Sequence, residues 1–104
     1  DLVQGTLDLL ILKVIALGPM HGWAIAQRIR EMSSVVLLVG QSALYPALHK
    51  LERQGWIRSQ WKTSETNRRA RYYSLTAAGR RAVAQEAANW ERLSAAISAI
   101  VRAT

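Results

Sequence analysis

The sequence predicts a mainly α-helical protein with one small β-hairpin: a winged helix-turn-helix followed by a C-terminal dimerisation helix. Three observations lead to this fold class. A leucine repeat between Gly40 and Gly55 has the spacing of one helix face. Two alternating segments on either side of a polar turn at residues 63–67 are typical of a hairpin. A seven-residue apolar repeat from Val83 to Ile97 predicts a long helix that needs a partner.

The helix between Gly40 and Gly55 is the element around which we expect the fold to be arranged. Leu44, Leu48 and Leu51 form one apolar stripe, and Gly55 can end the helix in the left-handed region. Such a helix can be anchored in a core and still enter a DNA major groove. The same pattern also fits an ordinary amphipathic helix with a solvated face. The remaining faces carry hydrogen-bond donors: Gln41, Ser42, Tyr45, His49, Lys50 and Arg53.

Two helices are expected before this one. The first would begin with Thr6 as its cap and end at residues 18–19, and it is apolar on nearly every side. A chain of this size cannot easily cover such a helix, so a partner chain is implied. The second helix would run from His21 or Gly22 to Met32, and the apolar residues 33–39 fit either a short strand or an extended linker.

The chain after Gly55 changes to strand patterns. Residues 56–62 and 69–75 alternate around the turn at 63–67, and the tip and returning arm of this hairpin are basic. Three helices followed by such a hairpin, the wing, make a winged helix-turn-helix. We therefore expect residues 1–75 to form a DNA-binding domain.

Residues 76–104 are expected to form a separate C-terminal dimerisation helix, with Thr76 as its cap. An exposed apolar seam needs a partner, and a second subunit is the nearest candidate. The predicted dimer interface combines this seam with the first helix: Leu7, Leu10, Ile11, Val83, Trp90, Leu93, Ile97 and Ile100.

The charge of the chain points to a polyanionic partner. The net charge is +7, eleven of the fourteen basic residues are arginine, and no acid occurs between Glu65 and Glu86 while five arginines do. Nucleic acid is the expected partner of such a basic block. An anionic membrane surface is the weaker alternative, because these arginines do not lie opposite a large lipid-seeking face.

Several other classes of protein do not fit the composition. A chain of 104 residues fits one domain, and half of the residues are hydrophobic, as in a folded protein. Without cysteine and with only His21 and His49, neither a metal site nor a cofactor is expected. We find no paired carboxylates, glycine-rich phosphate loop or nucleophile pair, so an enzyme is not expected. With no secretion signal and no membrane-length apolar run, we expect a cytoplasmic protein.

Several short motifs together resemble the PadR family of bacterial transcriptional regulators, and the short C-terminus is similar to the subfamily with a single C-terminal helix. They are LYPALHKLE at residues 44–52, GWI at 55–57, RRARYYSLT at 68–76 and AGR at 78–80, with GTL at 5–7 and HGW at 21–23. The resemblance implies a homodimeric repressor of an inverted-repeat operator, and some such repressors are released from DNA by aromatic or cationic lipophilic compounds. This chain departs from the family pattern in the apolar residues 35–39 and in Ser42, where glycine is common.

The candidate DNA contacts lie on the third helix and on the wing. Tyr45 could instead pack against the wing, and alternate strand residues face opposite sides, so one wing arginine is expected to point away from DNA. Pro46 lacks a backbone donor and is expected to shape the first turn. The full set is Gln41, Ser42, Ala43, Tyr45, Pro46, His49, Lys50, Arg68, Arg69 and Arg71.

Trp90 has two plausible roles. It could fill the dimer seam, or it could pair with its symmetry mate as a slot for a small aromatic or lipophilic effector. An RNA-binding or architectural winged helix without operator specificity remains a second reading of the whole chain.

Overall fold

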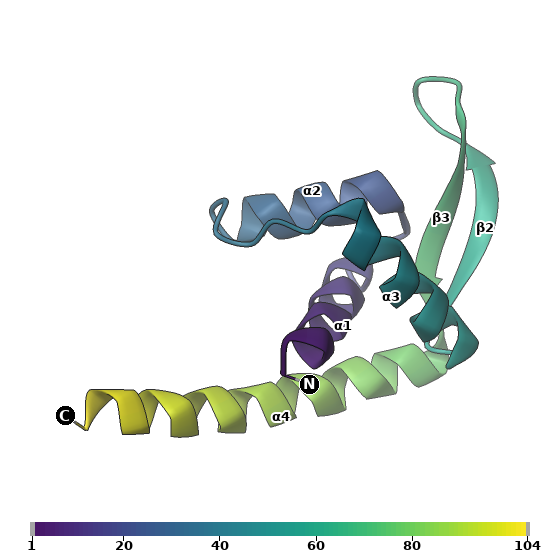
Figure 1. Cartoon of the computed structure of the whole chain (residues 1–104). Coiled ribbons are helices and arrows are strands. Elements are labelled where there is room, and N and C mark those ends of the chain that lie inside the picture. Colours follow the sequence, from purple (N-terminus) through teal and green to yellow (C-terminus); the bar gives the residue numbers. More distant parts are fainter. Residues whose placement is uncertain (1, 104) are drawn as a thin grey trace.

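Residues 2–103 are described by the structure, a computed structural model. Figure 1 shows three short helices and a hairpin gathered above one end of a long C-terminal helix. The helices are α1 (Leu2–Ile15), α2 (Gly22–Met32), α3 (Gln41–Arg53) and α4 (Ala77–Arg102). The strands are β1 (Met20–His21), β2 (Ile57–Thr63) and β3 (Arg69–Leu75). The expected fold class is confirmed.

The three strands form one antiparallel sheet in the order β1-β3-β2. In the hairpin, Ile57 pairs with Leu75 and Thr63 pairs with Arg69, so the register runs the full length of both strands. The two-residue strand β1 pairs with Tyr72 and Tyr73 and attaches the start of α2 to the wing. The sequence did not predict β1, because two residues are too few to show an alternating pattern.

The core lies where α1, α2 and α3 meet the root of the hairpin. Leu44, Leu48 and Leu51 are buried there, as the leucine stripe predicted, together with Ile57 and Leu75 from the strands. Gly55 has a φ of +79° after the end of α3, which confirms the expected left-handed stop. The side chain of Thr76 accepts a hydrogen bond from the backbone N–H of Gly79, which confirms the expected cap of α4.

Two local predictions were wrong. Helix α1 already contains Leu2, so Thr6 lies inside it and is not its cap. Residues 33–39 form neither a strand nor a plain extended linker, because they begin with a hydrogen-bonded turn. In that turn Ser34 and Val35 have φ values of 53° and 68°, in the left-handed region.

Helix α4 joins the rest of the fold only along its first half. Val83 packs against the core, and Gly79 lies so close to the wing root that an added Cβ would be 1.9 Å from the carbonyl oxygen of Trp56. Beyond α1, the helix continues outward (Figure 1). None of the helices within residues 2–103 combines the length and the apolar character needed to cross a bilayer.

Candidate nucleic-acid interface

Helix α3 presents a polar face to solvent along its whole length. Leu44, Ala47, Leu48 and Leu51 hold its other face in the core. Gly40 is the N-cap, and no side chain caps the helix there, so the first backbone N–H groups are not satisfied by a capping side chain. Free N–H groups at a helix N-terminus favour phosphate. The exposed candidates on this face are Gln41, Ser42, Ala43, Tyr45, Pro46 and His49.

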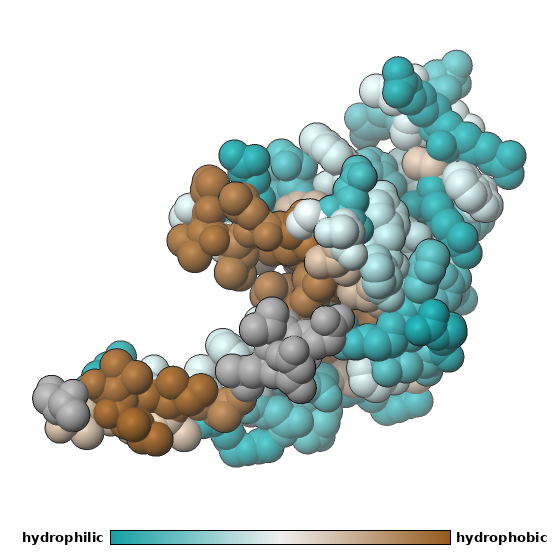
Figure 2. Space-filling view, viewed as in Figure 1, coloured by the Kyte–Doolittle hydropathy of each residue, from teal (hydrophilic) through white to brown (hydrophobic). Residues whose placement is uncertain are grey.

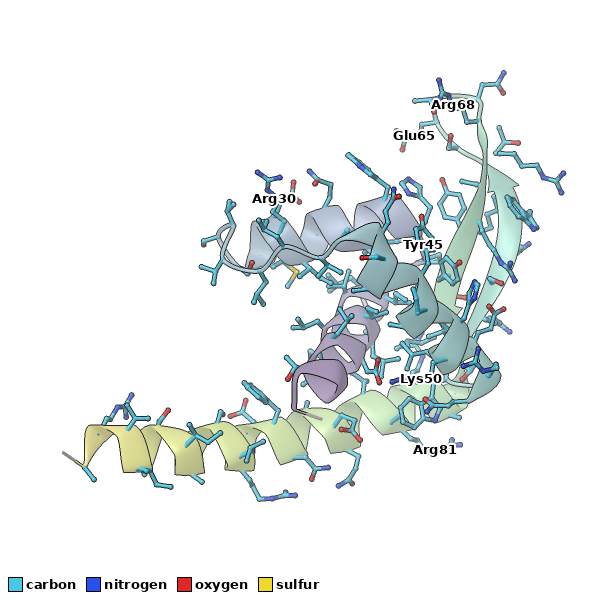
Figure 3. All side chains as sticks on the ribbon, viewed as in Figure 1. Arg30, Tyr45, Lys50, Glu65, Arg68 and Arg81 are labelled. Atoms are coloured by element: carbon cyan, nitrogen blue, oxygen red, sulfur yellow. The ribbon has the colours of Figure 1, made fainter. Side chains whose placement is uncertain are left out.

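A hollow of about 890 Å³ separates α3 and the start of α2 from the wing. Arg68, Arg69 and Arg71 line it on the wing side, and the only acid in its lining is Glu65. Figure 3 shows Arg68 at the tip of the hairpin and Tyr45 between α3 and the wing. The hollow is therefore a basic surface between a donor-rich helix and a projecting hairpin.

Tyr45 is held in place by α2 as well as by α3. An added Cβ on Gly22 would lie 2.7 Å from the Tyr45 hydroxyl and 3.0 Å from two ring carbons. The ring thus fills the space left by the missing side chain of Gly22, while 37% of the residue stays exposed. Tyr45 both packs inside the fold and reaches the hollow.

The wing arginines have different surroundings. The side chains of Arg68 and Arg69 belong to neither of the two ion pairs found within residues 2–103, and the Arg69 guanidinium lies 5.3 Å from the centre of the Trp61 ring. Arg71 instead donates a 2.7 Å hydrogen bond to Ser59 and lies 3.5 Å from a carboxylate oxygen of Glu52. One of the three arginines is therefore committed to the protein itself.

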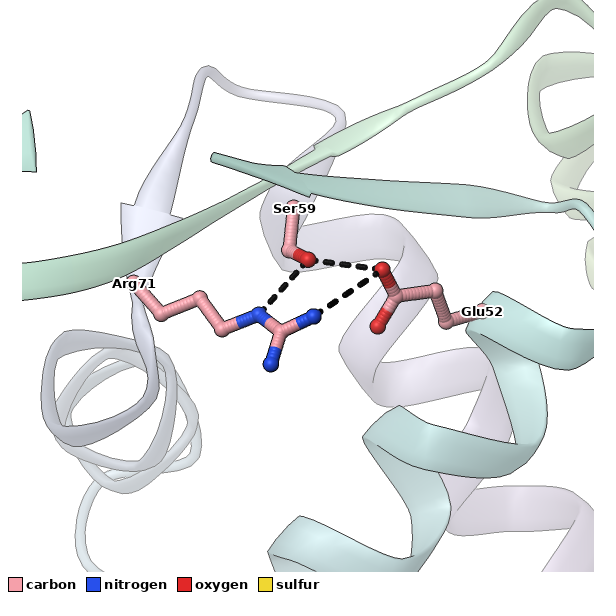
Figure 4. Close-up of polar contacts among 3 residues, drawn as sticks. All are labelled: Glu52, Ser59 and Arg71. Carbon is pink, nitrogen blue, oxygen red and sulfur yellow. Dashed lines mark hydrogen bonds and ion pairs between the residues drawn. The ribbon is translucent and has the colours of Figure 1, made fainter. Parts of the chain in front are cut away.

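Figure 4 shows that Arg71 belongs to a three-residue cluster joining α3 to both strands of the wing. Ser59 on β2 donates a 2.6 Å hydrogen bond to the same oxygen of Glu52 that Arg71 approaches. Because Glu52 lies on α3 and Arg71 on β3, the cluster fixes the wing relative to the helix.

Lys50 is also used inside the fold. Its ammonium group pairs with the carboxylate of Asp8 on α1, and both side chains are mostly buried. The pair ties the polar face of α3 to α1, so Lys50 is less available to an external phosphate than the sequence suggested. Pro46 lies in the second turn of α3 and not at its start, so the expectation that it shapes the first turn was wrong.

Burial raises the pKa of the Tyr73 phenol above its ordinary value. Tyr73 lies on β3 with its ring in the core, and the carboxylate of Glu52 acts in the same direction, whereas Arg71 acts in the opposite one. The hydroxyl therefore stays protonated and neutral at physiological pH.

Comparison with known proteins identifies this arrangement. Residues 11–85 match the model of the transcriptional regulator PadR-like family. The chain belongs to the PadR-like family. A PadR-like protein is a DNA-binding transcriptional regulator and not an enzyme.

Solved structures of similar proteins support the assignment to a PadR-like fold. A transcriptional regulator from Clostridium thermocellum has a TM-score of 0.87 and 29% identity over 98% of this chain and 99% of its own. A PadR family transcriptional regulator from Eggerthella lenta has a TM-score of 0.81 and 25% identity over 99% of this chain and 88% of its own. Among curated proteins, an uncharacterised 37.1 kDa protein in a transposon of Streptomyces fradiae is 38% identical over 84% of this chain, which spans only 24% of that protein.

The sequence missed three aromatic residues that shape the hollow of this PadR-like regulator. The Nδ1 atom of His21 accepts a 3.2 Å hydrogen bond from the backbone N–H of Ala24, so His21 caps α2. Its ring lies edge-on to Tyr72 at 5.4 Å. Trp23 and Trp61 line the same hollow with most of their surface exposed. The position of His21 just before a buried glycine at a helix start was a usable signal for the cap.

The residues predicted for a dimer interface fall into two groups in this PadR-like regulator. Trp90, Leu93, Ile97 and Ile100 are exposed on α4, and Leu7 and Leu10 are half-buried on α1. Val83 is half-buried against the subunit's own core. Ile11 is 0% exposed, so its assignment to the interface was wrong: α2 and α3 already cover that face of α1.

Proposed function

We propose that this PadR-like regulator is a homodimeric repressor that acts in the cytoplasm on an inverted-repeat operator. The observation that carries the proposal is the pairing of an exposed donor face on α3 with a wing fixed beside it by Glu52, Ser59 and Arg71. A helix of this kind can read base edges in a major groove while the wing contacts the backbone.

Within this proposal the candidate residues take different parts. Gln41, Ser42 and Ala43 approach phosphate or base edges at the start of α3, and Tyr45 and His49 follow along the groove. Arg68 and Arg69 contact phosphates or the minor groove through the wing. The remaining three position these groups: Pro46 within α3, Lys50 through Asp8, and Arg71 through Glu52.

The dimer in this proposal is two-fold symmetric and is formed by α4 with help from α1. Its support is the exposed apolar seam of Trp90, Leu93 and Ile97 on a helix that extends beyond the rest of the fold. Changing both Leu93 and Ile97 to Asp should give monomers in analytical ultracentrifugation and abolish operator binding. A variant that still sediments as a dimer would place the interface elsewhere.

Binding-site selection from random duplexes tests operator recognition. Recovery of one inverted repeat, with half-sites about one helical turn apart, supports two α3 helices entering successive major grooves. Equal affinity for every duplex, or a preference for RNA, would favour the architectural alternative. Transcription in vitro from a template carrying the recovered site then separates repression from activation.

A small effector could act at Trp90. The Trp90 ring is 39% exposed and borders a hollow of about 310 Å³ formed with Leu93 and with Thr6 and Leu9 of α1. A planar aromatic or lipophilic ligand bound there would release DNA only if it favoured one arrangement of the two subunits. Titration with a hydrophobic dye should change tryptophan fluorescence in the parent protein and not in Trp90→Ala. Equal binding by both proteins would exclude this site.

A further inference from the structure

The turn that follows α2 is held in a strained and specific shape. The hydroxyl of Ser33 accepts a 2.9 Å hydrogen bond from the backbone N–H of Leu37 and donates one of 3.2 Å to the carbonyl of Arg30. Val35 has a φ of 68°, a left-handed conformation that is costly for a β-branched residue. Backbone strain of this kind persists where the surrounding structure holds it in place, and it often marks a functional segment.

This turn holds large apolar side chains in solvent. Val36 is 78% exposed and Leu38 is 67% exposed, although neither is near the hollow between α3 and the wing. Beside them, Leu37 and Val39 form a groove of about 390 Å³ with Leu7 and Leu10 of α1 and with Ala43 of α3. A set of exposed aliphatic residues beside an apolar groove indicates an interaction surface.

The outer end of α4 is a second apolar surface. Ile100 is 74% exposed and Val101 is 70% exposed, and Ile97 precedes them on the same helix. Figure 2 shows the two apolar areas, one over the turn after α2 and one along the outer part of α4, with open space between them. The two surfaces lie on different elements of one chain and do not cover each other.

We infer that each groove receives the outer end of α4 from a second copy of this chain. The inference rests on the homodimer proposed above and names a contact within it. A two-fold axis makes each contact twice, once for each groove, so both apolar surfaces of both chains are covered by the same arrangement. The hollow beside Trp90 and this groove both include Thr6, so one continuous trough runs along α1 between α4 and the turn.

The area available fits a stable dimer. A large aliphatic side chain buries on the order of 100 Å² of apolar surface when it is fully covered. The exposed aliphatic residues of the turn, of α1 and of outer α4, together with Trp90, supply much of the ~800 Å² per partner that a standard interface buries. The α4 seam alone leaves the turn residues Val36 and Leu38 uncovered.

This contact would connect the partner subunit to the DNA-reading helix. The groove wall continues from Val39 into Gly40, the N-cap of α3, and Ala43 in the first turn of α3 also lines the groove. The partner's helix end would therefore set the position at which α3 begins. Loss of the contact should weaken operator binding even where the rest of the dimer persists.

Disulfide trapping tests the contact directly, because the chain has no cysteine. Leu38→Cys protein is mixed with Ile97→Cys, Ile100→Cys or Val101→Cys protein and oxidised. We expect a covalent heterodimer from at least one of these mixtures within minutes, since a disulfide forms only where the Cα atoms approach to about 4.4–6.8 Å. Arg81→Cys, on the exposed part of inner α4, replaces Leu38→Cys in the control mixture and should give no such product.

A charge substitution provides the second measurement. Leu38→Lys should raise the dimer dissociation constant at least tenfold in sedimentation, whereas Leu17→Lys, at an equally exposed leucine outside the groove, should leave it unchanged. Dimers that form normally, bind operator and give no trapped product would overturn the inference and leave the proposed function intact. Monomers at every concentration would overturn the proposed dimer and this contact together.

Discussion

The hydroxyl of Tyr45 lies where a side chain on Gly22 would have to be, 2.7 Å from the ideal position of its Cβ atom. Helix α2 therefore begins with a residue that has no side chain, because the first tyrosine of the DNA-reading helix occupies the space. The HTH geometry of this protein depends on that fit.

Gly22→Ala should push the Tyr45 ring out of its position. We expect a loss of about 1 kcal/mol in the free energy of unfolding, because overpacking of this size costs about 1–3 kcal/mol and a ring end can partly give way. Operator affinity should fall several-fold. In a Tyr45→Ala background the same change should cost almost nothing, and equal costs in both backgrounds, measured by denaturant unfolding, would show that the two residues are independent.

Lys50→Met should lower stability more than it lowers DNA affinity. The substitution leaves the mostly buried Asp8 without its ion-pair partner, and its Oδ1 atom already has no hydrogen-bond partner among the described residues. An unpaired buried polar group costs about 1–3 kcal/mol, more if charged. Asp8→Asn combined with Lys50→Met should recover part of the loss. A large drop in affinity with unchanged unfolding would show instead that Lys50 contacts DNA.

The wing arginines should separate in a salt titration. Replacing Arg68 or Arg69 with Ala should reduce the slope of log binding constant against log salt by about 0.9, the value for one phosphate contact. Arg71→Ala should weaken binding with little change in slope, because Arg71 orients the wing through Glu52 and Ser59. Equal slope changes for all three variants, measured on the same operator, would place Arg71 on the phosphates.

Gly79→Ala should be the most damaging single alanine substitution in the wing and α4. The added Cβ would lie 1.9 Å from the backbone oxygen of Trp56, and backbone cannot rotate away as a side chain can. We expect a loss of about 3 kcal/mol or more, or failure to fold. Gly40→Ala is the control, since the nearest atom to its Cβ would be 4.0 Å away, and its effect on the melting temperature should be small.

Alkaline pH should destabilise the protein partly through Tyr73. Its pKa is raised by burial, so the folded state holds the phenolic proton more tightly than the unfolded state does. The stabilising effect of this proton is complete below the ordinary tyrosine pKa near 10 and is lost as the pH rises through the folded value. Tyr73→Phe should therefore lose less unfolding free energy above pH 10 than the parent does. Parallel curves for the two proteins would contradict this.

Regular patterns in the sequence predicted most of the fold. The leucine stripe of α3, the alternation of the hairpin and the Thr76 cap each depend on residues close in sequence, so periodicity and side-chain chemistry were sufficient. The strained turn after α2 depends on a hydrogen bond from Leu37 to the Ser33 hydroxyl, which no periodic pattern reveals. The start of α1 was missed because a good capping residue, Thr6, lies inside the helix.

The candidate site was predicted by type more than by role. Donors on one face of α3 and arginines on the wing were visible in the sequence. The assignment of Lys50 to Asp8 and of Arg71 to Glu52 was not, because each pair joins residues far apart in the chain. Net charge identifies a basic surface, but only the positions of the acids show which basic residues remain free.

The close approach of Gly79 to the carbonyl of Trp56 also has a mechanical meaning. There is no clearance at this joint, so α4 and the root of the wing must turn together as one lever. Glu52, Ser59 and Arg71 then carry that rotation from the wing to α3. A small twist at the far end of α4 would thus move both DNA-contacting elements in step, without any hinge along the way to absorb it.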